Sequence, residues 1–295
     1  MTILIIGSGG QLGRDLMRSA QSRGLAVSGT GRPYCDITDR ASVNHTLADA
    51  GPLTAVINAA AYTAVDECES KPDLANAINC DGPGLLAQAC RERGLPLIQV
   101  STDYVFQGLK TSPYLPSDPV APVGVYGRSK AGGEAAVRRH LPEHVIVRTS
   151  WLFGLYGPNF VKTMLRLGRE KDELRVVDDQ VGCPTYAGDL SQALLDITVF
   201  VDRHRSGWGT YHFCNTGPLT WYAFARRIFM LARKYETLAV KQVWPILTAQ
   251  YPLPAPRPPY SVLDCSSLEE TFGVTRRPWE DALREMLAAL YASHG

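Results

Sequence analysis

The stretch TILIIGSGGQLG, residues 2–13, decides the fold of this chain. Its first residues form a short apolar, β-branched run that ends at a glycine, a pattern typical of a buried strand. The residues from Gln11 to about Ser22 follow with apolar side chains at helical spacing. The stretch therefore predicts a strand, a glycine-rich turn and a helix in immediate succession.

The glycines of this turn have the spacing of a dinucleotide-binding turn, and their place between a strand and a helix makes that pattern informative. Gly7 permits the tight turn, Gly10 lets a pyrophosphate approach the backbone, and Gly13 allows the helix to pack closely on the sheet. The helix N-terminus offers free N–H groups and a positive dipole to phosphates. We therefore predict a dinucleotide site here; the alternative is a tight turn without a ligand.

The same order of strand and helix recurs up to about residue 150. Uniformly apolar strands that alternate with helices are typical of a parallel sheet covered on both faces and joined by right-handed crossovers. The fold class is therefore α/β, a Rossmann-type doubly wound parallel sheet. The further strands are expected over 25–29, 54–61, 95–102 and 144–150, and the further helices over about 39–50 and 72–93 and from residue 125.

Beyond residue 150 the pattern loosens, which predicts a smaller C-terminal substrate-binding lobe packed on the sheet. Residues 175–185 look irregular, and the prolines of 242–260 make that segment extended or looped. Helices are expected over 189–197 and 279–290. The expected boundaries are 1–150 for the NAD(P)-binding domain, completed by about 189–215, and 151–188 with 216–295 for the lobe.

The composition favours a small-molecule partner. The 295 residues are 45% hydrophobic and 20% charged, with a net charge of +1, which gives no indication of a nucleic acid or an anionic membrane as partner. The seven cysteines lack the spacing of a disulfide framework or a zinc site. The opening apolar run is too short for a signal peptide, and no stretch is long enough for a membrane span. We therefore expect a protein of the reducing cytoplasm.

A second informative stretch is VYGRSKAGGEAAVRRHL, residues 125–141. It places Tyr126 and Lys130 four positions apart at the start of a predicted helix. Side chains at this spacing lie on one face, so the hydroxyl and the ammonium group can point at one spot. The pair is either a catalytic unit or two solvated surface residues, and its context decides between them.

That context resembles the extended short-chain dehydrogenase/reductase family, through the glycine turn, the NAA turn at Asn58 to Ala60 and the Tyr–Lys pair. The resemblance covers the whole chain and is closest to its dTDP-4-dehydrorhamnose reductase branch. The segments that carry it are GSGGQLG (7–13), NAAAYTAVD (58–66), STDYVF (101–106), VYGRSKAGGE (125–134), VRTSWLFG (147–154), VVDDQVGCPT (176–185) and RPPYSVLD (257–264).

The resemblance implies reduction of the C4 ketone of dTDP-4-dehydro-6-deoxy-L-mannose to dTDP-L-rhamnose. Thr102 would hydrogen-bond the sugar carbonyl and Tyr126 would give the proton, while hydride would come from the cofactor. Lys130 would hold the nicotinamide ribose, and its charge would lower the pKa of Tyr126. The catalytic residues expected are therefore Thr102, Tyr126 and Lys130.

The expected cofactor is NADPH, with NADH as the alternative. NAD-selective sites place an acid at the end of the second strand, but Arg32 arrives there first and would accept a 2′-phosphate; otherwise Arg32 is a solvated loop residue. The expected cofactor-binding residues are Gly7, Gly10, Gln11, Leu12, Gly13, Arg32, Asp36, Ile37, Ala61, Tyr62, Thr63 and Lys130.

The resemblance also implies substrate contacts, in addition to those of Thr102 and Tyr126. Asp103 and Trp151 follow two strands and would contact the sugar, although Asp103 could instead cap a turn and Trp151 could instead cover the core. Arg257 would bind the diphosphate through a charge-assisted fork. Tyr260 stands where the family usually has Asn, which leaves the details of the lobe open.

Some members of this family pair through an acidic surface bridged by a metal. The corresponding stretch TYAGDL, residues 185–190, is poor in carboxylates, so no metal is expected. A homodimer stays compatible with the sequence.

Three other functions stay open at this point. A nucleotide-sugar dehydratase needs Asp followed by Glu after the catalytic Thr, and here Tyr104 follows Asp103, which disfavours elimination. A regulatory subunit like that of methionine adenosyltransferase would bind NADP without turnover. A reductase of another nucleotide-sugar ketone, such as one giving 6-deoxytalose, would keep the chemistry and change the product.

Overall fold

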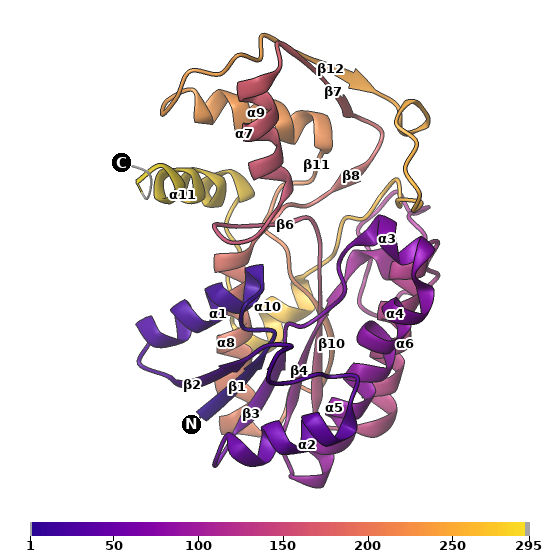
Figure 1. The fold of residues 1–295 in the computed structure, drawn as a ribbon, viewed down its shortest axis with the longest axis vertical. Coiled ribbons are helices and arrows are strands. Elements are labelled where there is room, and N and C mark those ends of the chain that lie inside the picture. The colour runs from indigo at the N-terminus through magenta and orange to yellow at the C-terminus, as the bar shows by residue number, and fades with distance from the viewer. Residues whose placement is uncertain (1, 293–295) are drawn as a thin grey trace.

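The computed structural model describes residues 2–292, and its centre is a six-stranded sheet of parallel strands (Figure 1). The strand order is β10-β5-β4-β3-β1-β2, with every neighbouring pair parallel. The α/β prediction is confirmed. The strands are β1 (Thr2–Ile6), β2 (Ala26–Thr30), β3 (Ala55–Asn58), β4 (Leu97–Thr102), β5 (His144–Thr149) and β10 (Gly209–His212).

Helices cover both faces of this sheet, which makes it doubly wound. One face packs against α1 (Gln11–Ser22), α8 (Ala187–His204) and α10 (Ser266–Phe272), and the other against α2 (Arg40–Asp49), α5 (Gly82–Glu92) and α6 (Val125–His140). Each face has its own apolar core, and burial of such surface contributes about 25 cal/mol per Å². Figure 1 shows the two helix layers on either side of the strands.

The glycine turn after β1 is packed so tightly that two of its glycines admit no side chain. Gly7 has φ of +81°, and a Cβ atom there would lie 2.7 Å from the backbone nitrogen of Ala60. A Cβ on Gly13 would lie 2.1 Å from the carbonyl oxygen of Gly7. Both positions therefore need glycine for packing, as the sequence predicts.

The helix expected over 72–93 has three parts. It begins with α4 (Pro72–Asn76), continues through a π-helical turn, η1 (Ala77–Asp81), and ends with α5. A π-turn adds a residue to the helical repeat and is often found at functional sites. Here it turns the buried side chain of Asn79 toward the loop after β3.

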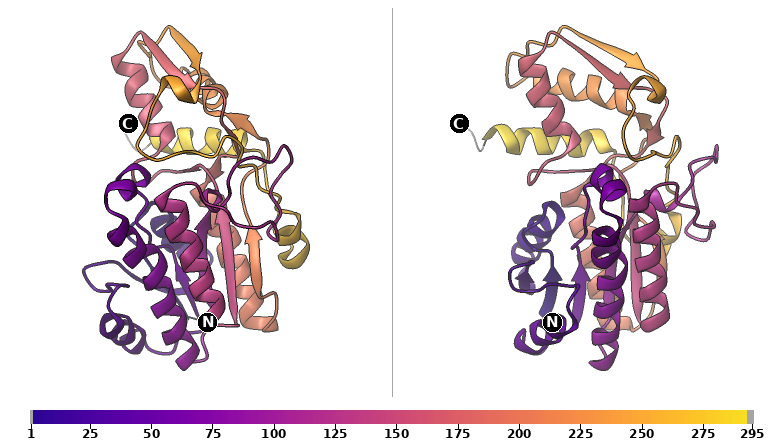
Figure 2. Two further views of the ribbon diagram at one scale, coloured as in Figure 1. Left: turned by 90° about the vertical axis from the view of Figure 1, so that its right-hand side faces the viewer. Right: turned by 45° about the vertical axis from the view of Figure 1, so that its right-hand side comes forward.

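The smaller lobe lies above the carboxyl ends of the strands (Figure 2). Its core joins α7 (Phe160–Glu170), α9 (Trp221–Ala232) and α11 (Trp279–Ala292) with β7 (Glu173–Val177). β7 pairs in parallel with β12 (Gln242–Ile246) despite Pro245. The expectation that 175–185 is irregular is wrong, because β7 and β8 (Val181–Gly182) lie there.

Short elements connect the sheet and the lobe. Residues of α10 belong to the core of the sheet, so the chain returns to the sheet before it ends in α11. The remaining elements are α3 (Val65–Ser70), β6 (Leu152–Phe153), β9 (Thr185–Tyr186), β11 (Leu219–Thr220) and the 3₁₀ turns η2 (Asp103–Val105) and η3 (Thr248–Gln250).

All seven cysteines are free, and the Sγ atoms of Cys214 and Cys265 lie 3.7 Å apart in the core.

Among residues 2–292, no helix is long and apolar enough to cross a membrane. Within the same residues, no group of three or more His, Cys, Asp or Glu side chains could hold a metal ion. The expected cytoplasmic location and the absence of a metal stay predictions.

Candidate active site

A cavity of about 690 Å³ lies at the carboxyl ends of β1, β3, β4 and β5, where an open α/β sheet binds its ligands. It runs from the glycine turn past the end of β4 to the start of α6. The lining residues are Gly9, Gly10, Gln11, Leu12, Arg14, Ala59, Ala60, Ala61, Thr63, Val65, Val100, Ser101, Thr102, Asp103, Tyr104, Tyr126, Lys130, Thr149, Ser150, Trp151, Leu152, Gly157 and Pro158.

The three residues expected to be catalytic line this cavity together. Thr102 ends β4, and Tyr126 and Lys130 lie in the first turns of α6, one turn apart. All three side chains are buried, and the Nζ atom of Lys130 donates a hydrogen bond of 2.8 Å to the carbonyl oxygen of Val100. The Thr102 hydroxyl accepts a bond of 3.2 Å from the backbone nitrogen of Tyr104. The sequence placed none of these contacts, but it selected all three residues.

Burial shifts the pKa values of the Tyr–Lys pair in opposite directions. Desolvation raises the pKa of Tyr126 far above its usual range, although the neighbouring Thr102 hydroxyl opposes the rise. Desolvation lowers the pKa of Lys130 to about 8, against the favourable charge of Glu134. In this structure Tyr126 is therefore a protonated phenol at neutral pH. Burial is the largest influence on this pKa, and the lowering by Lys130 stays a prediction.

Asp103 is a buried carboxyl group beside the Thr102 hydroxyl. Its Oδ1 atom accepts a hydrogen bond of 3.0 Å from Thr102 Oγ1, and its Oδ2 atom has no hydrogen-bond partner within the described residues. Desolvation raises its pKa to about 6, and the hydroxyls of Ser261 and Thr102 limit the rise. Thr102 is the N-cap of the 3₁₀ turn that follows, and a role of Asp103 at the sugar stays a prediction.

The cavity has room at the glycine turn for a phosphate group. A Cβ atom on Gly9 would meet nothing within 4 Å, and the N-terminus of α1 begins at Gln11. The free N–H groups of that helix end suit an anion. Gly10, Gln11 and Leu12 line this end, as the sequence predicted, and Ala61 and Thr63 line the opposite wall. The residues present therefore fit the diphosphate of a dinucleotide.

Other residues expected at the cofactor lie outside the cavity. Arg32 is exposed just beyond β2, near Asp36, whose carboxylate accepts hydrogen bonds from the backbone and hydroxyl of Thr38. The Ile37 side chain is buried in the core, which leaves only its backbone for a ligand. The Tyr62 hydroxyl points away, toward Glu67 at 2.8 Å. Gly7 and Gly13 act through packing, as described above.

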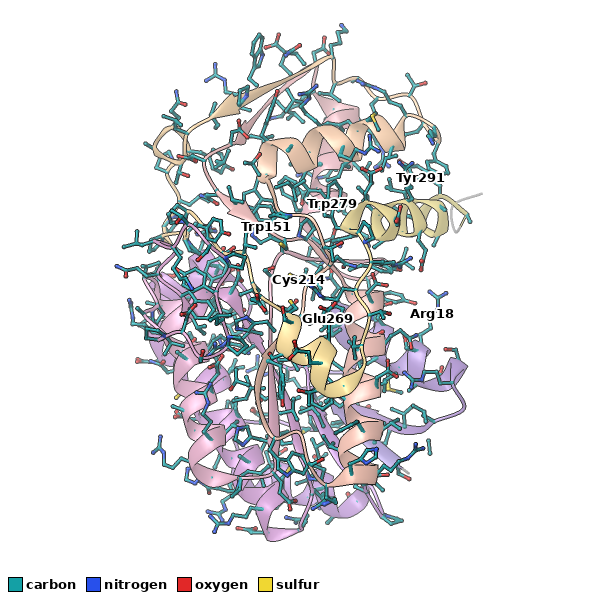
Figure 3. The ribbon with its side chains drawn as sticks, turned by 180° about the vertical axis from the view of Figure 1, so that it is seen from behind. Arg18, Trp151, Cys214, Glu269, Trp279 and Tyr291 are labelled. Carbon is teal, nitrogen blue, oxygen red and sulfur yellow. The ribbon has the colours of Figure 1, made fainter. Side chains whose placement is uncertain are left out.

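Trp151 lies at the junction of sheet and lobe (Figure 3) and has a strained backbone, with φ of +46°. Its ring stacks on Trp221 at 3.5 Å between centroids and 8° between planes. A left-handed conformation is rare for a bulky residue and persists only where the surroundings enforce it, which is common at functional sites. Trp151 thus forms a wall of the cavity, and Trp221 lines a second cavity beyond it.

This second cavity, of about 500 Å³, lies in the lobe and shares Tyr104 with the first. It is largely apolar and includes Phe160 and Trp221. Arg257 lines it and forms a two-point ion pair with Asp66, with Nη1–Oδ1 and Nη2–Oδ2 distances of 2.8 Å. Arg257 therefore lies near the junction of the two cavities and not in the first one. Tyr260 lines neither.

Sequence reasoning missed two residues that hold the site together. The Asn79 amide accepts a hydrogen bond of 2.8 Å from the backbone nitrogen of Tyr62 and donates to Tyr62 O and Ser129 Oγ. It thereby joins the loop after β3 to the catalytic helix α6. Trp221 was missed because no feature of its local sequence points to Trp151. A buried amide within an apolar helix is the signal that could have found Asn79.

Comparison with known proteins agrees with this geometry. The sequence model of the RmlD substrate binding domain matches residues 1–292. A dTDP-4-dehydrorhamnose reductase from Sinorhizobium fredii is 43% identical over 294 residues, which cover 98% of either chain.

Two solved structures are similar over the whole chain. The crystal structure of a dTDP-4-dehydrorhamnose reductase from Clostridium acetobutylicum has a TM-score of 0.91 and 42% identity, and covers 98% of this chain and 99% of that one. That of the Bacillus anthracis enzyme in complex with NADP has a TM-score of 0.90 and 37% identity, with the same coverage. Both fold and sequence therefore point to one group of proteins.

Proposed function

The chain belongs to the RmlD substrate-binding-domain family, that of the dTDP-4-dehydrorhamnose reductases, and we propose that it reduces the C4 ketone of dTDP-4-dehydro-6-deoxy-L-mannose to dTDP-L-rhamnose with NADPH. The observation that carries this proposal is the cavity that joins a glycine turn to Thr102, Tyr126 and Lys130. An enzyme that reduces a ketone needs a hydride donor and a proton donor on one carbonyl, and this cavity brings the places for both together.

The hydroxyls of Thr102 and Tyr126 hold the substrate carbonyl. Tyr126 is protonated at neutral pH because burial raises its pKa, so it can give its proton to the alkoxide oxygen as that oxygen forms. Lys130 carries a charge below about pH 8 and stabilises the developing phenolate. To donate to the carbonyl, the Thr102 hydroxyl turns its proton away from Asp103 Oδ1, which accepts it at 3.0 Å in this structure.

The glycine turn and the start of α1 hold the cofactor diphosphate, and Ala61 and Thr63 border the cofactor on the side of β3. The bound nicotinamide supplies the hydride. Lys130 reaches its ribose after release from the Val100 carbonyl. Arg32, exposed beyond β2, binds the 2′-phosphate of NADPH.

The substrate spans the two cavities. The sugar lies in the first, against Asp103 and Trp151, and the nucleoside lies in the apolar second cavity beside Trp221. Aromatic walls suit a flat base, and a nearby guanidinium suits a diphosphate. Arg257 therefore binds the diphosphate at the junction, near Tyr104, which lines both cavities.

The test is NADPH oxidation at 340 nm with enzymatically generated dTDP-4-dehydro-6-deoxy-L-mannose, followed by NMR of the product. We expect dTDP-L-rhamnose. dTDP-6-deoxytalose would keep the chemistry and change the face of the sugar that receives hydride.

If neither NADPH nor NADH is oxidised although NADPH binds measurably, the result would favour a regulatory NADP-binding protein. The position of Tyr104, where a dehydratase has Glu, disfavours elimination. Release of water from dTDP-glucose would contradict that interpretation. The homodimer stays a prediction, which light scattering can measure.

A further inference from the structure

A row of polar side chains crosses three neighbouring strands directly below the candidate active site. Ser101 of β4 pairs in register with Arg148 of β5, and Arg148 pairs with His212 of β10. The next register pair, Thr102 and Thr149, lines the cavity. All three side chains of the polar row are buried. Ser101 itself borders the cavity, and Arg148 and His212 lie directly behind it.

Glu134 of the catalytic helix α6 meets this row, one helical turn after Lys130. Its Oε1 atom accepts hydrogen bonds of 2.6 Å from Ser101 Oγ and 2.8 Å from Arg148 Nε. Its Oε2 atom accepts bonds of 2.7 Å from Arg148 Nη2 and from Arg138 Nη2. The carboxylate therefore ties α6 to both β4 and β5.

The partners of Arg148 are also complete. Its Nη1 atom donates to the Pro116 carbonyl at 3.2 Å and lies 3.4 Å from His212 Nε2, and its guanidinium lies over the Phe106 ring. Burial lowers the pKa of His212 to about 3, so the imidazole is neutral. The network then holds one fully buried cation, Arg148, and one buried anion, Glu134, which also pairs with the partly exposed Arg138.

Stability alone is a weak reason for such a pair. Desolvation of two buried ions offsets most of their attraction, and apolar side chains of similar volume often give equal or greater stability. A fixed geometry is a better reason, because a two-point ion pair allows only one arrangement of helix and strands. The elements it fixes are those that carry Thr102 and Lys130.

We propose that Glu134 is a positioning residue for the reaction: its ion pair with Arg148 fixes the end of β4 against α6, and its charge keeps Lys130 protonated. The proposal rests on the proposed function, because it assigns a role to Lys130. Glu134 is the neighbouring charge that acts on the pKa of Lys130, which desolvation lowers. Although burial raises the pKa of Glu134, its bonds and charge pairing with Arg148 outweigh this, and the carboxylate stays ionised.

The other titratable groups near these two residues come from several elements. Tyr126 lies on α6 itself, Asp103 begins the turn after β4, and Cys80 of η1 packs against Gly132. Burial raises the pKa of each of these three groups, so Tyr126 and Cys80 are neutral at pH 7. Asp103, with a pKa of about 6, changes charge below the range in which Lys130 does.

The experiment compares the pH dependence of kcat/KM in wild type, E134Q and E134D. E134Q keeps the shape and removes the charge. If the pKa of Lys130 in E134Q is about one unit lower than in wild type, kcat/KM falls about fivefold at pH 8 and little at pH 6. E134D restores the wild-type profile. E170Q is the matched control, because Glu170 forms an exposed pair with Arg166 four residues earlier on α7.

E134Q leaves Arg148 buried without its partner and can unfold the protein. The double variant E134Q/R148M removes both charges and leaves no buried ion without a partner. If Glu134 only stabilises the fold, this variant should have the wild-type pH profile of kcat/KM. If Glu134 keeps Lys130 protonated, the alkaline limb of the kcat/KM profile in the double variant should stay at lower pH than in wild type. A wild-type profile in the double variant would overturn the proposal.

A second measurement does not need turnover. The Lys130 resonance in protein labelled with ¹³C at lysine Cε, assigned with K130M, gives its titration directly. We expect a lower midpoint in E134Q than in wild type, and an unchanged midpoint would reject the role of Glu134. An inactive wild type with this difference intact would reject the proposed reaction and leave the charge coupling standing.

Discussion

Arg257 and Asp66, 191 residues apart in the sequence, form a two-point ion pair with both N–O distances at 2.8 Å. Asp66 is the second residue of α3, and Arg257 lies in the proline-rich segment after β12. The Asp66 carboxylate also accepts a bond of 3.1 Å from the backbone nitrogen of Ala255. The pair therefore anchors the wall of the second cavity to the domain that carries the glycine turn.

Variants of the two residues distinguish two roles for Arg257, binding of the substrate diphosphate and anchoring of its own loop. If the guanidinium binds the substrate diphosphate, R257A raises KM for the dTDP-sugar by roughly 10- to 100-fold, the loss of one or two charge-assisted hydrogen bonds, and changes kcat less. D66N breaks the ion pair and leaves the guanidinium free for the ligand, so KM stays near wild type. Equal increases in both variants would mean that the pair only holds the loop.

Replacing Tyr126 with Phe removes the proton donor and leaves the ring in place. We expect turnover to fall by about 10²- to 10⁴-fold, the usual contribution of a positioned general acid. NADPH binding, followed by the fluorescence of the cofactor, stays unchanged. Y34F is the matched control, because Tyr34 is 83% exposed. Near-normal turnover in Y126F would reject the role of the phenol.

Replacing Arg32 with Ala tests the choice of cofactor. We expect KM for NADPH to rise roughly tenfold, equivalent to ~1.4 kcal/mol of charge-assisted binding, and KM for NADH to stay constant. R40A serves as the control, because Arg40 is an exposed arginine that pairs with Glu92 on the neighbouring helix. Identical KM values for NADPH in wild type and R32A would leave Arg32 as a solvated loop residue.

The buried carboxyl of Asp103 makes stability depend on pH. Its pKa is 3.8 in the unfolded chain and about 6 in the folded protein, so the folded state binds the proton more tightly. The Asp103 carboxyl therefore contributes about 3 kcal/mol to the free energy of unfolding below pH 3.8, and this contribution is lost as the pH rises through 6. D103N removes this loss.

The difference in unfolding free energy between D103N and wild type, measured in urea, should therefore grow by about 3 kcal/mol between pH 3 and pH 7. The comparison of variants is needed because Asp15 is also buried, with a pKa raised to about 6 by desolvation. D15N should show a change of the same sign. A constant difference for D103N would mean that its carboxylate is solvated when ionised.

The local sequence was sufficient for the Rossmann sheet, because buried parallel strands and amphipathic helices each have a period that short stretches display. It was also sufficient for Tyr126 and Lys130, which one helix places on one face. The glycine requirement at Gly7 and Gly13 follows from the turn, and the clash distances of 2.7 and 2.1 Å agree. These features depend on neighbours in the chain.

Contacts between distant segments were not accessible in the same way. Three contacts join residues that lie far apart along the chain: the Trp151–Trp221 stack, the Asn79 amide between the loop after β3 and α6, and the β7–β12 pair. No periodicity encodes such partners. The lobe was therefore placed as a region, and the helix over 279–290 was predicted within it, but its strands were not.

The sequence by itself determined the fold class, the glycine turn and the identity of the groups at the carboxyl ends of the strands. The tertiary structure decided their charge states and partners. Lys130 has a pKa of about 8 because folding removes it from water, and Glu134 stays ionised because folding places Arg148 against it. Burial and distance between remote segments set these properties, and neither exists until the chain has folded.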